Sequence, residues 1–275
     1  MKKSGLLLII LLVFTLVLGG CSSKSDKGQQ ASGSEKKKIV IGATPVPHVE
    51  ILNVVKPLLE EKGIELEIKE FTDYVTPNMA LNDKELDANF FQHVPYMDEF
   101  SKSNNVELVS VAKVHVEPLG AYSQNIKSKD EIKDNAIIAI PNDATNEGRA
   151  LLLLQKQGLI KLKDENGLTQ TPLDVIENPK NLQFEELEAA QLPRVLIDVD
   201  FAIINTNFAL EADLNPTKDA IFIEDADSPY ANIVTTRPDN KDKEEIIELI
   251  NAINSEEVKD FITKEYKGAI IPAFN

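Results

Sequence analysis

Hydrophobic residues in this chain fall into short runs rich in β-branched residues, which alternate with stretches of helical periodicity. The runs taken as strands are Ile39 to Ala43, Leu66 to Phe71, Val106 to Val111, Ala136 to Ile140, Phe201 to Ile204 and Ala220 to Ile223. A helix is predicted over 49–62, ending at Gly63 and kinked or split by Pro57, and another over 146–157. Near the C-terminus, apolar residues of 246–253 share one helical face. The alternation predicts an α/β fold with largely parallel sheets.

Two extended segments with polar flanks, 114–122 and 230–236, interrupt this alternation. We interpret them as crossovers between two lobes, each of which has enough residues for its own core. The chain would leave the first lobe near residue 118 and return to it near 229. The predicted division is therefore 39–118 plus 229–275 for lobe 1 and 119–228 for lobe 2.

The N-terminus has the pattern of an export signal. Lys2 and Lys3 precede an apolar run from Leu6 to Leu18, which is short for a membrane span. The run ends at LGGC, which resembles the lipobox of bacterial lipoproteins, and Cys21 is the only cysteine. The sequence predicts a signal peptide over 1–20, lipidation of Cys21 and a flexible Ser/Gly/Lys-rich tether over 21–38. A chance cysteine after an ordinary cleaved signal is the alternative.

Charge and motifs narrow the function classes. A formal net charge of −16 makes nucleic acid and anionic lipid surfaces unfavourable partners. The chain contains no nucleophile elbow, Walker loop, HExxH or CxxC motif, so no catalytic residue is assigned. The three histidines are too far apart in sequence to form a local metal motif, and neither a metal nor a cofactor is predicted.

Polar and aromatic clusters follow the predicted strands, where open α/β sheets bind ligands. These clusters are 71–74, 87–96, 140–150, 204–207 and 228–232. Arg149 falls in what we predict to be the first turn of a helix, where a cation is unfavourable and a bound carboxylate would explain it. A salt bridge to Glu147 or another acid is the alternative. Asn205 should face a cleft at a strand end, unless it is a plain helix N-cap.

Together these residues resemble the methionine-binding lipoproteins of the NlpA type, the substrate-binding components of a methionine ABC importer. The segments that carry the resemblance are GATPVPH (42–48), FQHVPYM (91–97), IPNDATNEGRALLLLQKQGLIKL (140–162), DVIENPKNL (174–182), INTNFA (204–209) and SPYANIV (228–234). The resemblance implies a two-lobed periplasmic-binding-protein fold that closes over its ligand. It also implies an ABC transporter permease as partner, with the protein anchored by Cys21 on the extracytoplasmic face of a membrane.

The resemblance further implies roles for individual residues. Arg149 would hold the ligand's α-carboxylate through its guanidinium fork. Asn205 and Asn232, helped by Asn146, would meet the α-amino and carboxylate groups. The walls of the side-chain pocket would be Tyr74, Phe91, His93 and Tyr96, where sulfur–aromatic contacts form. The predicted ligand is L-methionine, with D-methionine or a methionine-containing dipeptide as the alternative, and a lipid-anchored hydrolase or an adhesive lipoprotein as readings from other classes.

Overall fold

The computed structural model describes residues 37–225 and 229–274. The predicted signal peptide, the lipidation site Cys21 and most of the predicted tether lie outside the described residues. Lys36–Asn275 forms one unit by its internal contacts. Within the described residues, no helix is both long and apolar enough to cross a membrane.

The first sheet has six strands in the order β13-β4-β12-β3-β1-β2. Three of them, β1, β2 and β3, run parallel to one another, whereas β12 is antiparallel to both β3 and β4. The strands are β1 (Lys37–Ala43), β2 (Ile64–Glu70), β3 (Ala88–His93), β4 (Val109–Val116), β12 (Ala231–Thr236) and β13 (Ile271–Pro272). Its helices are α1 (Glu50–Glu60), α2 (Thr76–Asn82), α3 (Val94–Asn104), α7 (Glu244–Ile253) and α8 (Glu256–Tyr266).

The second sheet has five strands in the order β11-β5-β10-β6-β9. Strands β6, β9 and β10 are parallel, and β5 is antiparallel to β10. Its elements are β5 (Gly120–Tyr122), β6 (Ile137–Pro141), β9 (Gln183–Leu187), β10 (Phe201–Ile204) and β11 (Phe222–Ile223), with α4 (Ala144–Lys156), α5 (Thr206–Glu211) and α6 (Pro216–Asp219). A separate pair, β7 (Lys161–Leu162) and β8 (Val175–Glu177), follows α4.

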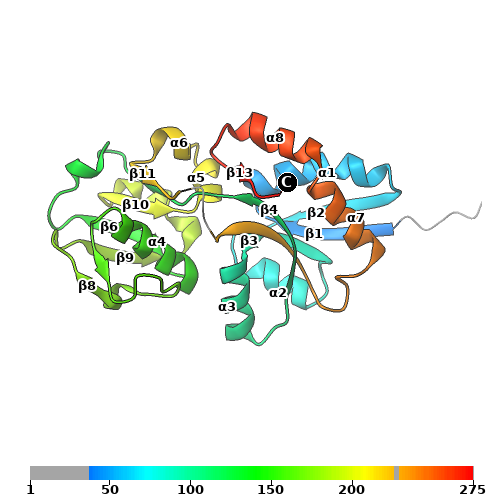
Figure 1. The fold of residues 1–275 in the computed structure, drawn as a ribbon, viewed down its shortest axis with the longest axis horizontal. Coiled ribbons are helices and arrows are strands. Elements are labelled where there is room, and N and C mark those ends of the chain that lie inside the picture. The colour runs from blue at the N-terminus through cyan, green and yellow to red at the C-terminus, as the bar shows by residue number, and fades with distance from the viewer. Residues whose placement is uncertain (1–36, 226–228, 275) are drawn as a thin grey trace, which may run out of the picture. The chain divides into compact units, whose positions relative to one another are not determined.

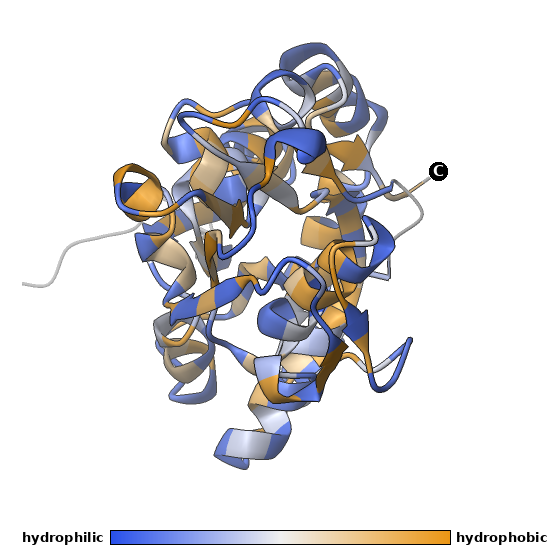
Figure 2. Cartoon of the chain, turned by 90° about the vertical axis from the view of Figure 1, so that its left-hand side faces the viewer, coloured by the Kyte–Doolittle hydropathy of each residue, from blue (hydrophilic) through white to orange (hydrophobic). Residues whose placement is uncertain are grey.

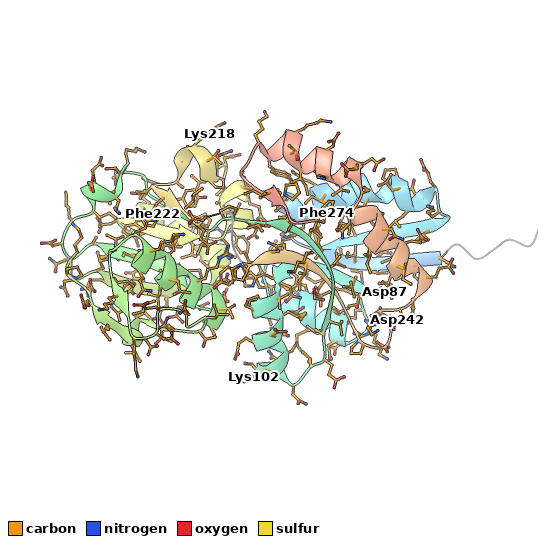
Figure 3. All side chains as sticks on the ribbon, viewed as in Figure 1. Asp87, Lys102, Lys218, Phe222, Asp242 and Phe274 are labelled. Atoms are coloured by element: carbon orange, nitrogen blue, oxygen red, sulfur yellow. The ribbon has the colours of Figure 1, made fainter. Side chains whose placement is uncertain are left out.

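Each sheet has its own hydrophobic core. In the first, α1 buries one helical face, with Ile51, Leu52, Val55 and Leu59 completely inaccessible to solvent, and packs beside α7 and α8 (Figure 1). Helices in Figure 2 carry both hydrophobic and hydrophilic residues, as helices that cover a sheet with one face must. Charged side chains such as Lys102, Lys218 and Asp242 are exposed (Figure 3).

Several sequence predictions are confirmed and others are wrong. Gly63 and Gly158 follow their helices with φ of +75° and +71°, a conformation that glycine adopts without steric cost. The sequence predicted a kink or a split at Pro57, and the helix is not split, because α1 runs through Pro57 as one helix. The sheets are mixed rather than largely parallel, because segments read as crossovers are strands: β12 lies within the first sheet and β5 within the second.

The chain changes sheet twice. It passes from the first sheet to the second between Val116, which ends β4, and Gly120, which begins β5. It returns between Ile223, which ends β11, and Ala231, which begins β12. The carboxyl end of β3 and the amino end of β12 therefore lie beside residues that approach from the second sheet, and the polar clusters of the sequence gather there.

Candidate functional site

All eight side chains predicted to bind ligand line one cavity. The cavity is bounded by Tyr74, Phe91, Gln92, His93, Tyr96, Glu117, Asn146, Arg149, Asn205, Thr206, Asn207 and Asn232. Sequence reasoning missed four of these, Gln92, Glu117, Thr206 and Asn207. Strands β3 and β12 supply residues from one side, and the starts of α4 and α5 supply residues from the other. The site is therefore assembled from both sheets, as the clusters at strand ends predicted.

The cavity is small in this structure. Its volume, measured for the centre of a water-sized sphere, is about 20 Å³, which is room for about one water molecule. Pockets that bury a small organic ligand usually measure roughly 300–1,000 Å³. Admission of an organic ligand of that size therefore requires the walls to move apart.

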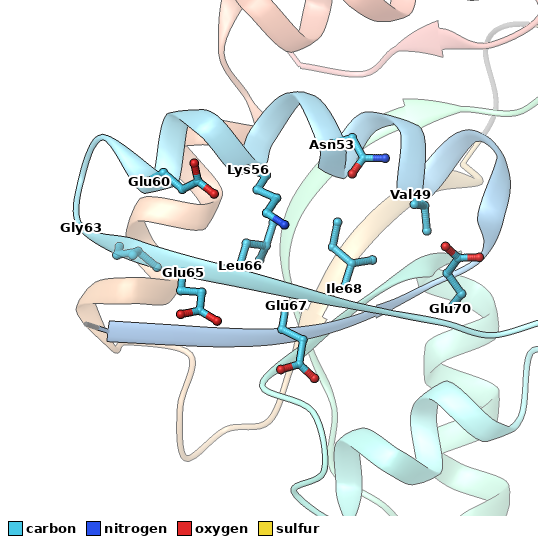
Figure 4. A pocket seen from close by; sticks show the side chains of 11 residues that line it. Val49, Asn53, Lys56, Glu60, Gly63, Glu65, Leu66, Glu67, Ile68 and Glu70 are labelled. Carbon is cyan, nitrogen blue, oxygen red and sulfur yellow. The ribbon is translucent and has the colours of Figure 1, made fainter. Parts of the chain in front are cut away.

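A larger hollow lies elsewhere, beside α1 and β2, with about 650 Å³ by the same measure. Figure 4 shows that Lys56 from α1 and carboxylates such as Glu60, Glu65 and Glu67 surround it. None of the predicted site residues lies there. Its mixed charges and open position are those of a surface groove, so we place the candidate site at the smaller, buried cavity.

Aromatic rings form one wall of the cavity. Tyr74 lies 5.8 Å from Phe91 and 5.1 Å from Phe208, measured between ring centroids. Its hydroxyl donates to Asn207 Oδ1 at 2.5 Å, so this wall joins the two sheets. Tyr96 packs edge-on to Tyr74 and donates its hydroxyl to the Tyr74 carbonyl at 2.9 Å. The rings present an apolar surface whose polar ends are satisfied.

His93 is held as a neutral donor. Its Nδ1 accepts the Tyr96 backbone N–H at 3.2 Å, which caps α3, so the proton of the neutral ring is on Nε2. Nε2 then donates to Asn146 Oδ1 at 3.3 Å. Burial, together with the nearby Arg149 charge, lowers the pKa of His93 to about 3.

Asn205 begins α5 but does not cap it. No side-chain capping bond forms, and instead Asn205 Nδ2 donates to Asn146 Oδ1 at 2.9 Å. Its own Oδ1 is buried without a hydrogen-bond partner among the described residues. Asn207 Nδ2 is likewise buried and unpaired. Buried polar atoms without partners are rare in proteins, so the cavity presents one acceptor and one donor for a polar ligand.

Arg149 makes closer contacts with protein groups than the sequence suggested. Its Nε and Nη2 donate to the two carboxylate oxygens of Glu224 at 2.8 and 2.5 Å, and Nη2 also donates to the Glu117 carbonyl at 2.7 Å. The guanidinium lies 4.3 Å from the centre of the Tyr230 ring. Nη1 makes no hydrogen bond to any described residue.

One prediction about Arg149 is wrong. Helix α4 begins at Ala144 after the cap Asp143, so Arg149 is in the second turn, where the helix dipole no longer disfavours a cation strongly. Arg149 also forms a salt bridge with Glu224, which is the alternative that the sequence left open, with another acid in place of Glu147. Its contact with a ligand carboxylate stays a prediction. A salt bridge and a ligand contact are compatible here, because Arg149 also lines the cavity.

Behind the cavity, two distant histidines meet at one carboxylate. His115 Nε2 and His48 Nε2 lie 2.7 and 3.3 Å from Glu117 Oε1, and Glu117 Oε2 accepts the Asn207 backbone N–H at 3.1 Å. Burial opposes ionisation, but the His115 bond and the neighbouring positive groups outweigh it and hold the pKa of Glu117 below its usual range. Burial lowers the pKa of His48 to about 4.

Hydrogen bonding explains this cluster without a metal. The donor atoms of His48, His115 and Glu117 lie within 4.8 Å of one another, which is close enough for a shared ion. Histidine ligands of metals normally donate their other ring N–H to a protein group. His115 Nδ1 has no such partner among the described residues. We therefore assign no metal to these residues.

The cluster also orients Asn232. His48 Nε2 lies 3.3 Å from the Glu117 carboxylate, which can only accept, so Nε2 carries the ring proton, and it also faces Asn232 Oδ1 at 3.1 Å. His48 Nδ1 then accepts the Thr44 hydroxyl at 2.7 Å. Since the amide oxygen of Asn232 is turned to His48, its amide nitrogen is the group available to the cavity. A donor at this position suits a carboxylate oxygen.

Comparison with known proteins shows where the chain belongs. The NlpA lipoprotein family matches residues 39–274. The chain is a member of the NlpA lipoprotein family. It is 46% identical to the D-methionine-binding lipoprotein MetQ of Salmonella typhimurium, over 94% of each chain. It is 45% identical to a probable D-methionine-binding lipoprotein MetQ of Pasteurella multocida, over 98% of this chain and 99% of that one.

Solved structures of similar proteins support the family assignment and the fold. A nutrient-binding protein from Burkholderia cenocepacia, described as bound to methionine, superposes with a TM-score of 0.84 at 47% identity. The match covers 86% of this chain and all of that one. The crystal structure of the methionine-binding protein MetQ gives a TM-score of 0.83 at 45% sequence identity with this chain. The predicted two-lobed binding-protein fold is confirmed.

Proposed function

We propose that this protein captures methionine outside the cytoplasm and delivers it to a methionine ABC importer. The observation that carries the proposal is the cavity itself. One cavity collects every predicted ligand residue, with a buried unpaired acceptor, Asn205 Oδ1, and a buried unpaired donor, Asn207 Nδ2. An amino acid's ammonium and carboxylate are the complementary pair. The names of close relatives support methionine as the amino acid.

The side-chain wall supports a thioether ligand. Tyr74, Phe91 and Tyr96 surround one side of the cavity, and sulfur–aromatic contacts contribute about 0.3–1.5 kcal/mol each. Because the cavity is too small for methionine as it stands, we propose that residues 39–118 with 229–275 and residues 119–228 move as two lobes. Ligand shifts the population toward closure only by its greater affinity for the closed form.

Calorimetry with L- and D-methionine tests this function. The protein is first unfolded, dialysed and refolded to remove bound ligand, and the material released is identified by mass spectrometry. We expect L-methionine to bind in the low micromolar range or tighter, which corresponds to about −8 kcal/mol or better. Norleucine, which has the same head group but no sulfur, should bind more weakly. No heat with either enantiomer, and no amino acid released, would contradict the proposal.

We further propose that Cys21 carries the lipid anchor. One acyl chain holds a protein only marginally, whereas two or more anchor it stably. Cys21→Ala should leave the protein unlipidated and unprocessed. Metabolic labelling with a palmitate analogue in the host bacterium measures this, with Ser22→Ala as the control that keeps its label. Equal labelling of the Cys21→Ala protein would exclude the anchor at this position.

A further inference from the structure

The carboxylate of Asp143, next to the cavity, fixes the orientation of the Asn146 amide, which lines the cavity. Asp143 accepts the Asn146 backbone N–H at 3.0 Å as the cap of α4. It also accepts Asn146 Nδ2 through both oxygens, at 3.0 and 2.9 Å. Because an ionised carboxylate has no donor, the nitrogen of the Asn146 amide must point toward Asp143. The oxygen of that amide therefore points the other way.

Two hydrogen-bond donors on the opposite side of the Asn146 amide fit this orientation. Asn146 Oδ1 accepts from Asn205 Nδ2 at 2.9 Å and from His93 Nε2 at 3.3 Å. The orientation of His93 is set separately, because its Nδ1 accepts the Tyr96 N–H. Turning the Asn146 amide would place its nitrogen against two donors, Asn205 Nδ2 and His93 Nε2, and its oxygen against the acceptor-only carboxylate of Asp143.

The Asn146 amide orients the next amide in the chain of hydrogen bonds, that of Asn205. With its nitrogen committed to Asn146, its oxygen lines the cavity, buried and without a partner among the described residues. An unpaired buried acceptor costs free energy unless a donor arrives. An ammonium supplies such a donor, and a carboxylate does not.

We propose that Asp143 is a positioning residue that, through Asn146, holds the Asn205 oxygen toward the ligand and so makes the cavity selective for ligands with a free α-ammonium. This inference rests on the proposed function, since it assumes that the cavity holds methionine. It explains why a half-buried aspartate and two buried asparagines lie in a row. It also assigns the two ends of the amino acid, because Asn232 on the other side presents its nitrogen.

Asp143→Asn tests the relay with little change in shape. Asparagine is as good a helix cap as aspartate, so α4 should survive. Its new amide nitrogen would face Asn146 Nδ2, so Asn146 and then Asn205 should turn over. We expect the affinity for L-methionine to fall about 10-fold to 100-fold, the loss of a hydrogen bond to a charged group. The affinity for 4-(methylthio)butanoate, which lacks the amino group, should stay within threefold.

The measurement is the ratio of the two affinities, by calorimetry near pH 8, because burial raises the pKa of Asp143. Asp73→Asn is the matched control. Asp73 also accepts two helix-start backbone N–H groups, at 2.7 Å each, but has no bond to Asn146. The control removes the same charge near the cavity, and the ratio should remain that of the wild type.

A double-variant cycle separates the relay from general damage. Asn205→Ala should lose the same preference for methionine over its deaminated analogue. Adding Asp143→Asn to Asn205→Ala should then change the ratio no further, because the relay acts through Asn205. If Asp143→Asn does not fold, the ratio in Asn205→Ala still decides whether this oxygen selects the ammonium.

Three results would overturn the inference. An unchanged ratio in Asp143→Asn, an equal loss for both ligands, or an Asn205→Ala protein that keeps the full preference would each do so. Wild-type protein that binds neither ligand would instead overturn the proposed function as well. A wild type that binds methionine while Asp143→Asn keeps its ratio would leave the proposed function intact.

Discussion

Arg149→Ala is expected to weaken methionine binding about 30-fold to a few thousand-fold, the cost of removing one member of a buried charge pair. The Arg149 side chain is 3% exposed and lines the cavity, with Nη1 free of hydrogen bonds to described residues. Its removal would leave the carboxylate of Glu224 without its ion-pair partner, close to the ligand's own carboxylate. The attraction between Arg149 and the ligand's carboxylate would thus be replaced by repulsion between that carboxylate and Glu224, in a site with little water to screen it.

Glu224→Gln is the matched variant for this test. It removes the partner of Arg149 and keeps the guanidinium, so it should lower the free energy of unfolding while methionine affinity stays equal or rises. Calorimetry gives the affinities, and urea unfolding gives the stability of each variant. An Arg149→Ala protein that binds within threefold of wild type would show that Arg149 serves only the salt bridge with Glu224.

The fold was predictable where hydrophobic patterns are regular. The strands β1, β6 and β10 contain long buried runs, and their sequence predictions differ from the structure by two residues or fewer at each end. Strand β12 was misread as a crossover because its sequence carries Asn232, Thr235 and Thr236. All three are polar and yet buried between β3 and β4, so the strand lacks the hydrophobic pattern that would have marked it.

The position of the site was predictable for a different reason. Strand-end clusters and the family resemblance marked the eight residues that line the cavity. Glu117 gave no such signal, because a lone glutamate in an acidic chain is ordinarily a solvated surface residue. Only the fold brings His48 and His115 to it. Asn207 belongs to the polar cluster 204–207, but its role could not be read from the sequence, since it depends on a backbone N–H that donates to Glu117 and on the Tyr74 hydroxyl that donates to its Oδ1.

Acid is expected to destabilise the ligand-free protein through its buried histidines. Burial lowers the pKa of His48 to about 4 and that of His93 to about 3, against an ordinary value of 6.5. As pH falls below 6.5, the unfolded chain takes up protons that the folded chain refuses. The free energy of unfolding therefore decreases as pH falls from about 6.5 toward 4 for His48 and toward 3 for His93, and neither contribution changes above 6.5.

The comparison must be made between variants, because a carboxyl group acts in the opposite direction. Burial, with nearby Glu186, raises the pKa of Glu147 to about 7, so acidification stabilises the fold through this residue. Its contribution is common to wild type and histidine variants and cancels in their difference. Between pH 8 and pH 5, each neutral histidine should account for about 2 kcal/mol of lost stability.

Urea unfolding of ligand-free protein at these two pH values gives the measurement. His48→Gln and His93→Gln should each lose about 2 kcal/mol less than wild type on acidification. The double variant should lose about 4 kcal/mol less if the two sites are independent. Gln92→Ala is the control, since Gln92 is a buried hydrogen-bonding neighbour that does not titrate. It should be less stable than wild type by the same amount at both pH values. If the histidine variants and wild type lose equal stability between pH 8 and pH 5, both rings must already be protonated or solvated in the fold. The buried, neutral state assigned to His48 and His93 would then be wrong.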